Sequence, residues 1–272
     1  MPEGADLRLK MLRGIIRSID AISRTLSGAP FFAVKEAEAL LIELDGRTGH
    51  ALVAAMLEKN GGTEIVPRGL ENVPKTGPVI IGSTHPIGTF DFIAHAGALL
   101  DHRPDLKVVA NREAERFLGA ECHIAVDVDR SDKVTTARKT IDAMQSHLRD
   151  GGAVLIFGSG RVPPLRDGYL KERKWRSGIT RVSAMTGAPI IPASADMRNS
   201  RHFYKTYDAV HFLTRGNEYA AHMVASFRYV SELLEKLGGR YEVHYGQPLQ
   251  PGLAPEEIQK AAEALVPGLY RS

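Results

Sequence analysis

Cysteine is almost absent from this chain. Cys122 is the single thiol, so no disulfide can form within the chain, and such sparse use is typical of a reducing compartment. Long apolar runs are missing too, since none approaches the roughly 20 residues that a membrane-spanning helix requires. The opening stretch, MPEGADLRLK, has no signal-type apolar core. We therefore expect a cytoplasmic protein that at most lies on the inner face of the membrane.

An excess of charge of one sign is also missing. The 272 residues include 35 Lys and Arg against 32 Asp and Glu, which gives a formal net charge of +3. That imbalance is too weak to indicate nucleic-acid binding, and no nucleic-acid partner is expected. The apolar and charged fractions, 43% and 25%, are those of a globular protein. The length suits one large α/β domain or a domain with an added subdomain.

Residues 1–62 are predicted to form an N-terminal helical segment. Over residues 6–26, apolar side chains recur at helical spacing and basic side chains fall largely between them. A basic amphipathic helix of this kind can lie in a membrane interface. Packing against its own domain is the equally plain alternative. A second helix is predicted over residues 34–59, ended by the glycines of KNGG.

Residues 63–272 have the pattern of an α/β domain. Helical stretches alternate with short apolar runs that suit strands buried on both faces of a sheet. These runs are PVIIGST, LKVVAN, CHIAVDVD, AVLIFGSG and APIIPASA, with RYEVHYGQPL as a later strand. Helices are predicted from Ser131 to the glycines at 151 and 152, over 217–237, and from Pro255. We predict a mixed, mostly parallel central sheet with helices on both faces, and ligands at the carboxyl ends of its strands.

The stretch THPIGTFD, residues 84–91, follows the first apolar run. It places His85 six residues before Asp91. Six residues leave two side chains about 120° apart on a straight helix and about 20 Å apart on a strand, so only a compact turn brings them together. Pro86 and Gly88 provide such a turn. If the two side chains touch, His85 is a catalytic base and Asp91 its orienting carboxylate; if they do not, the stretch is an ordinary connection from a strand to a helix.

Two other histidines have an aspartate at the same spacing. His95 precedes Asp101 by six residues, and His202 precedes Asp208 by six. His95 is predicted to lie on a helix and His202 in a polar connector. Neither pair has the turn-forming residues that would bring its side chains together.

Four ordered blocks resemble the glycerolipid (lysophospholipid) acyltransferase family. HPIGTFD resembles the first, in the form found in the branch of hemolysin-like proteins and ornithine-lipid N-acyltransferases. AVDVDR, ending at Arg130, resembles the second block, LIFGSGRVP the third, and GAPIIPAS the fourth. The resemblance covers roughly residues 63–250.

This resemblance implies an enzyme that moves a fatty acyl group from a thioester to a lipid acceptor. The donor would be acyl carrier protein or coenzyme A, and the acceptor hydroxyl would belong to a lysophospholipid or a glycerol phosphate; no further cofactor and no metal are implied. The expected catalytic residues are His85 and Asp91, and the expected substrate-binding residues are Arg130, Gly158, Ser159, Gly160 and Arg161. An N-acyltransferase acting on an amino-acid amine and a catalytically silent lipid-binding protein remain alternatives. A metal-dependent hydrolase is a weaker one, because no tight His-x-His or His-Glu-x-x-His cluster occurs.

Several of these residues have a second interpretation. Gly158 and Gly160 allow backbone N–H groups to approach a phosphate or an oxyanion, but a tight turn after a buried strand is favoured. Ser159 lacks the Gly-x-Ser-x-Gly context of a hydrolase nucleophile and is a minor alternative in that role. Arg130 suits the grip on a phosphate or carboxylate. It could equally form a salt bridge with a neighbouring aspartate, Asp127 or Asp129.

A basic segment surrounds the only tryptophan, Trp175. Its members are Arg161, Arg166, Lys171, Arg173, Lys174 and Arg176. Such a run is usually a solvated loop, although it also suits an anionic partner such as coenzyme A, acyl carrier protein or a lipid phosphate.

Four positions depart from the family pattern. Thr84 replaces an asparagine that is frequent in the branch, Phe92 a glycine, and Gly158 a proline. Ser159 stands where many glycerolipid members have glutamate. The last departure weakens any transfer of acceptor specificity, so the choice between an oxygen and a nitrogen acceptor stays open.

Overall fold

The computed structural model describes residues 14, 16–26, 28–44, 46–111, 114–126 and 133–271. Packing divides them into two units. The helical unit contains the described residues up to Gly46 together with Asn199–Lys236, and the sheet unit contains Arg47–Arg198 and the chain from Leu237 onward. This division differs from the predicted boundary at residues 62 and 63, because α3 (Gly49–Leu57) packs against α4 (Thr89–Leu99) of the sheet unit.

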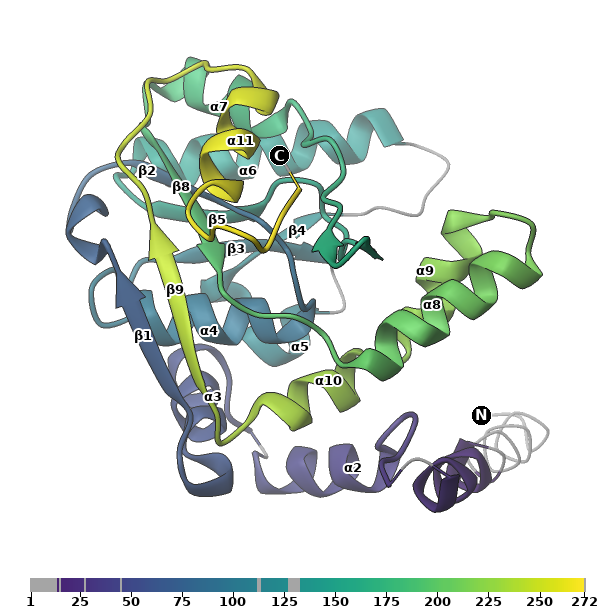
Figure 1. The fold of residues 1–272 in the computed structure, drawn as a ribbon. Coiled ribbons are helices and arrows are strands. Elements are labelled where there is room, and N and C mark those ends of the chain that lie inside the picture. The colour runs from purple at the N-terminus through teal and green to yellow at the C-terminus, as the bar shows by residue number, and fades with distance from the viewer. Residues whose placement is uncertain are drawn as a thin grey trace. The chain divides into compact units, whose positions relative to one another are not determined.

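A seven-stranded sheet forms the centre of the sheet unit (Figure 1). Its order is β1-β9-β8-β2-β5-β3-β4, and every neighbouring pair is parallel except β8–β9. The strands are β1 (Glu64–Arg68), β2 (Val79–Ser83), β3 (Lys107–Asn111), β4 (His123–Val126), β5 (Ala153–Phe157), β8 (Ile190–Ala195) and β9 (Arg240–Tyr245). The predicted mixed, mostly parallel sheet is confirmed, and each predicted run contains a strand.

Strand β1 adds to the predicted set. It contains Pro67, which cannot donate to a sheet ladder and therefore weakens the strand pattern. β1 lies at the edge of the sheet, beside β9, where a proline is tolerated. A separate antiparallel hairpin, β6 (Leu165–Arg166) and β7 (Tyr169–Leu170), follows β5.

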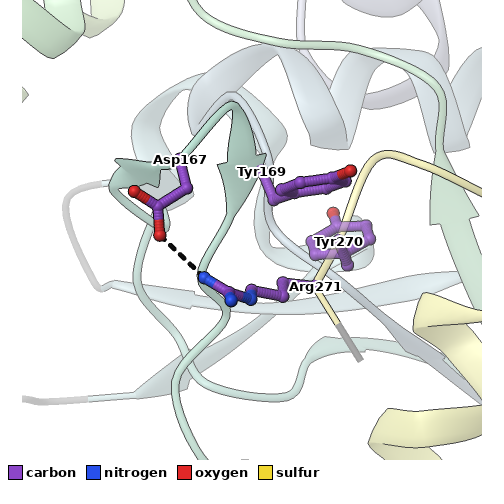
Figure 2. Close-up of a pocket in the computed structure, with 4 residues that line it drawn as sticks. All are labelled: Asp167, Tyr169, Tyr270 and Arg271. Atoms are coloured by element: carbon purple, nitrogen blue, oxygen red, sulfur yellow. Dashed lines mark hydrogen bonds and ion pairs between the residues drawn. The ribbon is translucent and has the colours of Figure 1, made fainter.

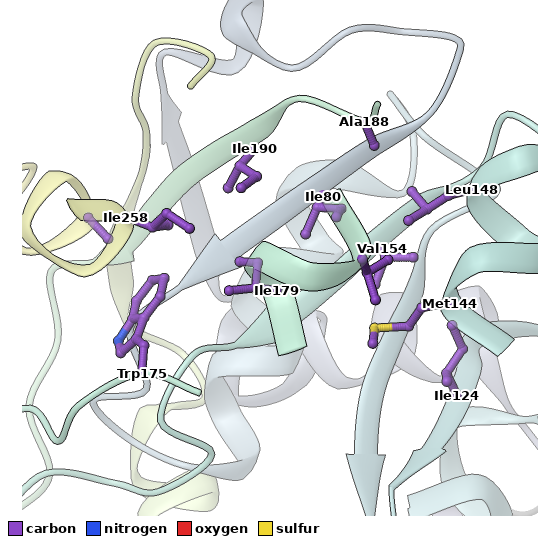
Figure 3. Close-up of a cluster of buried hydrophobic side chains, with 12 residues drawn as sticks. Ile80, Ile124, Met144, Leu148, Val154, Trp175, Ile179, Ala188, Ile190 and Ile258 are labelled. Carbon is purple, nitrogen blue, oxygen red and sulfur yellow. The ribbon is translucent and has the colours of Figure 1, made fainter. Parts of the chain in front are cut away.

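Helices cover both faces of the sheet, as predicted. On one face lie α6 (Lys133–Arg149), α7 (Gly178–Thr186) and α11 (Pro255–Glu263), and on the other lies α4 with α3 against it (Figure 1). A short helix, α5 (Glu115–Leu118), precedes β4. Figure 3 shows the hydrophobic core beneath the first group of helices, where Ile80 and Val154 of the sheet meet Met144, Ile179 and Ile258 of the helices. Because helices cover both faces of the sheet, its continuous apolar strands are buried on both sides.

The helical unit consists of residues 16–26 and four named helices. These are α2 (Val34–Glu43), α8 (Arg201–Leu213), α9 (Glu218–Ser226) and α10 (Tyr229–Lys236). Among the described residues, no helix is both long enough and apolar enough to cross a bilayer.

Three helix predictions were wrong. The single helix predicted over 34–59 is two helices, α2 and α3, because Gly46 between them and Gly49 at the start of α3 have φ of 71° and 53°. The helix predicted over 217–237 is interrupted between α9 and α10. His202 lies in α8 and not in a connector, since the Ser200 hydroxyl accepts the N–H of Phe203 and caps that helix.

Arg228 lies at the interruption between α9 and α10 and is buried completely. Its Nη1 donates to the carbonyl oxygens of Phe31 and Pro30, at 3.0 and 3.3 Å. Its Nε donates to Glu232, itself buried, at 3.3 Å. Glu232 also accepts the N–H and the hydroxyl of Ser200, each at 2.6 Å. The interruption therefore centres on a buried ion pair that ties α10 to the start of α8 and to the loop before α2.

Candidate functional site

Three neighbouring strands end together and bring three of the four blocks to one place. Ser83 at the end of β2 pairs with Phe157 of β5 and with Ala193 of β8. Beyond the strands, the N–H of Gly158 donates to the Ser83 carbonyl at 3.0 Å, and the N–H of Thr84 donates to Ala193 at 3.1 Å. These bonds fix the carboxyl ends of the strands, where an open α/β sheet binds its ligands.

His85 and Asp91 meet across the turn after β2. Asp91 Oδ2 lies 2.8 Å from His85 Nδ1. The same oxygen accepts the N–H groups of Ile87 and Gly88, at 2.9 and 2.8 Å. Gly88 has φ of 107°, a conformation that favours glycine. Asp91 lies in the first turn of α4, where the helix dipole stabilises an anion, so the turn and the helix together hold the carboxylate against the histidine.

The His85 ring is held on two sides. It stacks on Phe157 with ring centroids 4.3 Å apart and an angle of 24° between the planes, and its Nδ1 faces Asp91. The Nδ1–H bond is not aligned with the carboxylate, a geometry common in free enzymes. The His85 side chain is 17% exposed, whereas Asp91 is fully buried. A proton on Nδ1 leaves the lone pair on Nε2, which is the atom of a histidine base that receives a substrate proton.

His95 is a structural neighbour of this pair. It lies on α4, as predicted. Its Nε2 is 2.8 Å from the Ser83 hydroxyl, and its Nδ1 is 3.2 Å from the Tyr245 hydroxyl. Burial lowers the pKa of His95 to about 4. Its ring is therefore neutral at pH 7, and both nitrogens are already engaged.

The glycine-rich turn after β5 is held by its own backbone. The N–H of Gly158 is bonded to Ser83, and the N–H of Gly160 to Phe157, each at 3.0 Å. The Ser159 hydroxyl donates to the carbonyl of Arg161 and accepts its N–H. The N–H groups of the two glycines are thus bonded within the tight turn, and substrate binding by Gly158 and Gly160 stays a prediction. Substrate binding by the side chains of Ser159 and Arg161 stays a prediction.

Trp175 gives the reason for glycine at position 158. A Cβ on Gly158 would lie 1.9 Å from Cδ2 of Trp175, far inside contact distance. A proline there would also remove the N–H that bonds to Ser83. Trp175 is 5% exposed and belongs to the core shown in Figure 3, so it is separate from the basic surface around it. Packing therefore accounts for the departure from proline.

Arg130 and its alternative partners, Asp127 and Asp129, lie outside the described residues, as does the predicted cap Ser131. Over the part of the chain that the structure describes, no three His, Cys, Asp or Glu side chains are grouped so that they could hold a metal ion.

Glu172 belongs to the site, although no motif pointed to it. It follows β7, and both of its carboxylate oxygens are buried without a hydrogen-bond partner. Burial, with a smaller contribution from the carboxylates of Glu263 and Asp91, raises the pKa of Glu172 to about 8 against the opposing effects of the Ser159 hydroxyl and the His85 backbone N–H. The one available signal in the sequence was a single acidic residue inside the basic run KERKWR.

A pocket of about 420 Å³ adjoins these residues (Figure 2). It is lined by Asp167, Tyr169, Tyr270 and Arg271, and Arg271 Nη1 lies 2.7 Å from Asp167 Oδ2. The Tyr270 hydroxyl is buried and has no hydrogen bond of good geometry, although the Thr84 and Ser194 hydroxyls lie near it. Burial raises the pKa of Tyr270 well above its usual range, and the neighbouring Glu172 carboxylate adds to the shift. Tyr270 thus borders both the pocket and Glu172.

Comparison with protein families places this site in a known group. The family model described as Acyltransferase matches residues 64–196, which contain all four blocks and the His85–Asp91 pair. Residues 64–196 therefore form a domain of the Acyltransferase family.

Individual relatives of this chain are distant. A lyso-glycine lipid O-acyltransferase of Phocaeicola vulgatus is 22% identical over 138 residues, which are 50% of this chain and 48% of that protein. The match thus spans about half the length of this relative. Among solved structures, the 1-acyl-sn-glycerophosphate (LPA) acyltransferase PlsC from Thermotoga maritima is 16% identical, with a TM-score of 0.45 over 75% of this chain and 71% of that one.

Proposed function

We propose that this protein is an acyltransferase that moves a fatty acyl group from a thioester to a hydroxyl group of a lysolipid acceptor. The observation that carries the proposal is the 2.8 Å contact between His85 and Asp91 at the carboxyl end of β2, within the residues that match the family. The name of the Phocaeicola relative, an O-acyltransferase of a lyso-glycine lipid, supports an acceptor oxygen.

In the proposed reaction His85 acts directly on the acceptor. Nε2 takes the proton of the acceptor hydroxyl while the oxygen attacks the thioester carbonyl, and Asp91 stabilises the imidazolium that forms. The tetrahedral intermediate then collapses, the carbon–sulfur bond breaks, and the thiolate takes the proton back from His85. No covalent acyl-enzyme is needed. The engagement of the Ser159 hydroxyl with the Arg161 backbone supports this route.

The proposed donor is acyl carrier protein or coenzyme A. Lys171, Lys174 and Arg176 are exposed on the segment that follows β7. Exposed basic side chains next to a site favour the docking of an anionic carrier, and such docking weakens with salt. The phosphates of coenzyme A and an acidic carrier surface would both be accommodated.

Release of free thiol tests the function. The protein would be offered palmitoyl thioesters of acyl carrier protein and of coenzyme A, each with a lysophosphatidate, with a lysolipid that carries an amino-acid head, or without acceptor. We expect acceptor-dependent release, and the ester product identified by mass spectrometry. Formation of an amide would replace the proposal with N-acyl transfer. No release from either donor by folded protein would leave a lipid-binding protein on an acyltransferase fold.

We further propose that the helical unit contacts the cytoplasmic surface of a membrane. Eleven of the thirteen exposed large apolar side chains among the described residues lie in this unit. In residues 16–26, Arg17 and Arg24 pair with glutamates of α2, whereas Ile19, Ile22 and Leu26 are exposed. A helix that packs its polar side on its neighbour and exposes its apolar side suits a lipid interface.

Vesicle flotation tests this contact. Replacing the exposed Phe212 and Leu213 with serine should lower binding to anionic vesicles by about tenfold or more, because each apolar side chain adds to the buried area. Met185→Ser, which changes an exposed apolar residue of the sheet unit, is the matched control. Equal binding by all three proteins would contradict the proposal.

A further inference from the structure

Buried polar atoms without a partner are concentrated in the residues around His85. In the described part of the sheet unit six buried polar atoms have no hydrogen bond: His85 Nδ1, whose contact with Asp91 is an ion pair, Asp91 Oδ1, Glu172 Oε1 and Oε2, Trp175 Nε1 and the Tyr270 hydroxyl. Buried polar groups nearly always find partners in folded proteins. Such a concentration indicates a binding site, in which a bound molecule provides the missing hydrogen bonds.

Glu172 is the one residue of this set with two buried oxygens that lack a hydrogen bond. Its two buried oxygens have no hydrogen bond of good geometry, and the charged groups that act on it among the described residues are the carboxylates of Glu263 and Asp91. The other polar groups facing it are the Ser159 hydroxyl, the His85 backbone N–H and Tyr270. No lysine or arginine of the described chain compensates this carboxylate, although it follows Lys171 directly. Buried carboxylates are normally paired with a cation.

We propose that Glu172, together with the Tyr270 hydroxyl, binds an ammonium group on the head of the acceptor lipid, beside the hydroxyl that His85 deprotonates. This inference rests on the proposed function. An ammonium has three N–H donors, which suit two carboxylate oxygens and a phenol oxygen. A carboxylate partner also keeps the amine protonated. A protonated amine is not a nucleophile, so the same contact directs acylation to the oxygen.

The acceptor head reaches Glu172 from the pocket in Figure 2. Tyr270 lines that pocket and also borders Glu172, so rotation of its ring connects the two. Tyr270 is held by the backbone around it, since the carbonyl of Leu269 accepts the N–H of Leu170 at 2.9 Å. The ring, and not the main chain, is therefore the part that has to move.

The test compares two acceptors that differ only in charge. One is a lysolipid with a free amine in its head, and the other is the same lipid with that amine acetylated. Wild-type protein should show a kcat/KM about ten- to a hundredfold higher for the free amine, the size expected of a charge-assisted hydrogen bond. Glu172→Gln should abolish this preference, so that kcat/KM for the free-amine lipid falls to that for the acetylated lipid. Tyr270→Phe should reduce the preference in part.

Glu263→Gln is the matched control, because Glu263 is a neighbouring carboxyl that is already bonded to Gln259. It should keep the preference. Equal activity of the wild type on the two lipids would overturn the inference while leaving the acyltransferase proposal intact. So would a Glu172→Gln variant that loses kcat equally on both, because that result assigns Glu172 to proton transfer.

Binding without turnover separates this inference from the proposed function. Trp175 is the only tryptophan, and its indole N–H belongs to the same set of buried atoms, so its fluorescence reports occupancy. The free-amine lipid, titrated in the absence of donor, should change the emission of the wild type at a concentration at least tenfold lower than that needed for Glu172→Gln. If this difference appears and no thiol is ever released, the ammonium site stands and the transferase proposal fails.

The pH dependence of unfolding provides a readout that needs no substrate. The pKa of Glu172 is about 8 in the folded chain and near its ordinary value of 4.5 in the unfolded one. The folded chain therefore binds the proton more tightly, and Glu172 lowers stability as the pH rises from about 4.5 to about 8. The melting temperature of Glu172→Gln should exceed that of wild type, and this difference should grow as the pH rises from about 4.5 to about 8. The free-amine lipid should make the difference smaller, because it binds the wild-type carboxylate. A margin that does not change with pH or lipid would contradict the inference.

Discussion

His85→Ala should slow acyl transfer by about 10²- to 10⁴-fold, the range that a positioned general base contributes. The expected loss is in kcat, since the substrates keep their other contacts. His85 is only partly buried and its main packing contact is Phe157, so the variant should remain folded. Initial rates of thiol release, with thermal unfolding as the check on folding, would measure both effects.

Two further variants make this result specific to the dyad. Asp91→Asn keeps the shape of the side chain and removes the charge that stabilises the imidazolium, so it should lose activity by a smaller factor than His85→Ala. Ser159→Ala should only weaken transfer, because Ser159 serves the turn. Near-normal rates from His85→Ala would sink the mechanism. A trapped acyl group on Ser159 would replace it with a covalent one.

Arg228→Met should destabilise the helical unit by about 3–5 kcal/mol, the usual consequence of breaking a buried ion pair. The change leaves Glu232 buried without its cation and removes the donors to the carbonyls of Pro30 and Phe31. Methionine fills most of the space, so the loss reflects the unpaired charge more than a cavity. Urea unfolding followed by circular dichroism at 222 nm would measure it.

Arg17→Ala is the matched control for this prediction. Its ion pair with Glu38 lies in the same unit and is exposed, and such pairs contribute about 0–1 kcal/mol. Trp175 lies in the sheet unit, so its fluorescence follows that unit separately. Equal midpoints for Arg17→Ala and Arg228→Met would show that the buried pair contributes no more than a surface one.

The parts of the fold that depend on short-range pattern were predictable. Five apolar runs became strands because a parallel sheet covered on both faces requires continuous burial, and the run written PVIIGST became the central strand β2. The contact between His85 and Asp91 followed from one local argument, that Pro86 and Gly88 force a turn. Local chain geometry carries both of these predictions.

The parts that failed depend on partners distant in sequence. Helical spacing continues from α9 to α10 without a visible break, yet Arg228 turns inward to carbonyl groups almost 200 residues earlier in the chain. Glu172 reaches His85 only because β7 and the core contact of Trp175 bring its segment back over the strand ends. Ser159 stands where many members of the family have glutamate. Here a carboxylate lies close to Ser159 in space, but it belongs to Glu172, thirteen positions later in the chain. Neither contact has a local sequence pattern.

The packing of Trp175 on Gly158 also constrains how this chain can evolve. With the indole in place, any side chain at position 158 collides with it, and with a side chain already at 158 the indole has no room. Substitutions at the two positions are therefore epistatic: each is harmful or tolerated according to the other. A lineage that acquires a larger residue at 158 must first replace Trp175 with a smaller residue. The intermediate sequence, with the smaller residue at 175 and glycine still at 158, has a cavity over Gly82. That unfavourable intermediate separates this chain from one with proline at position 158.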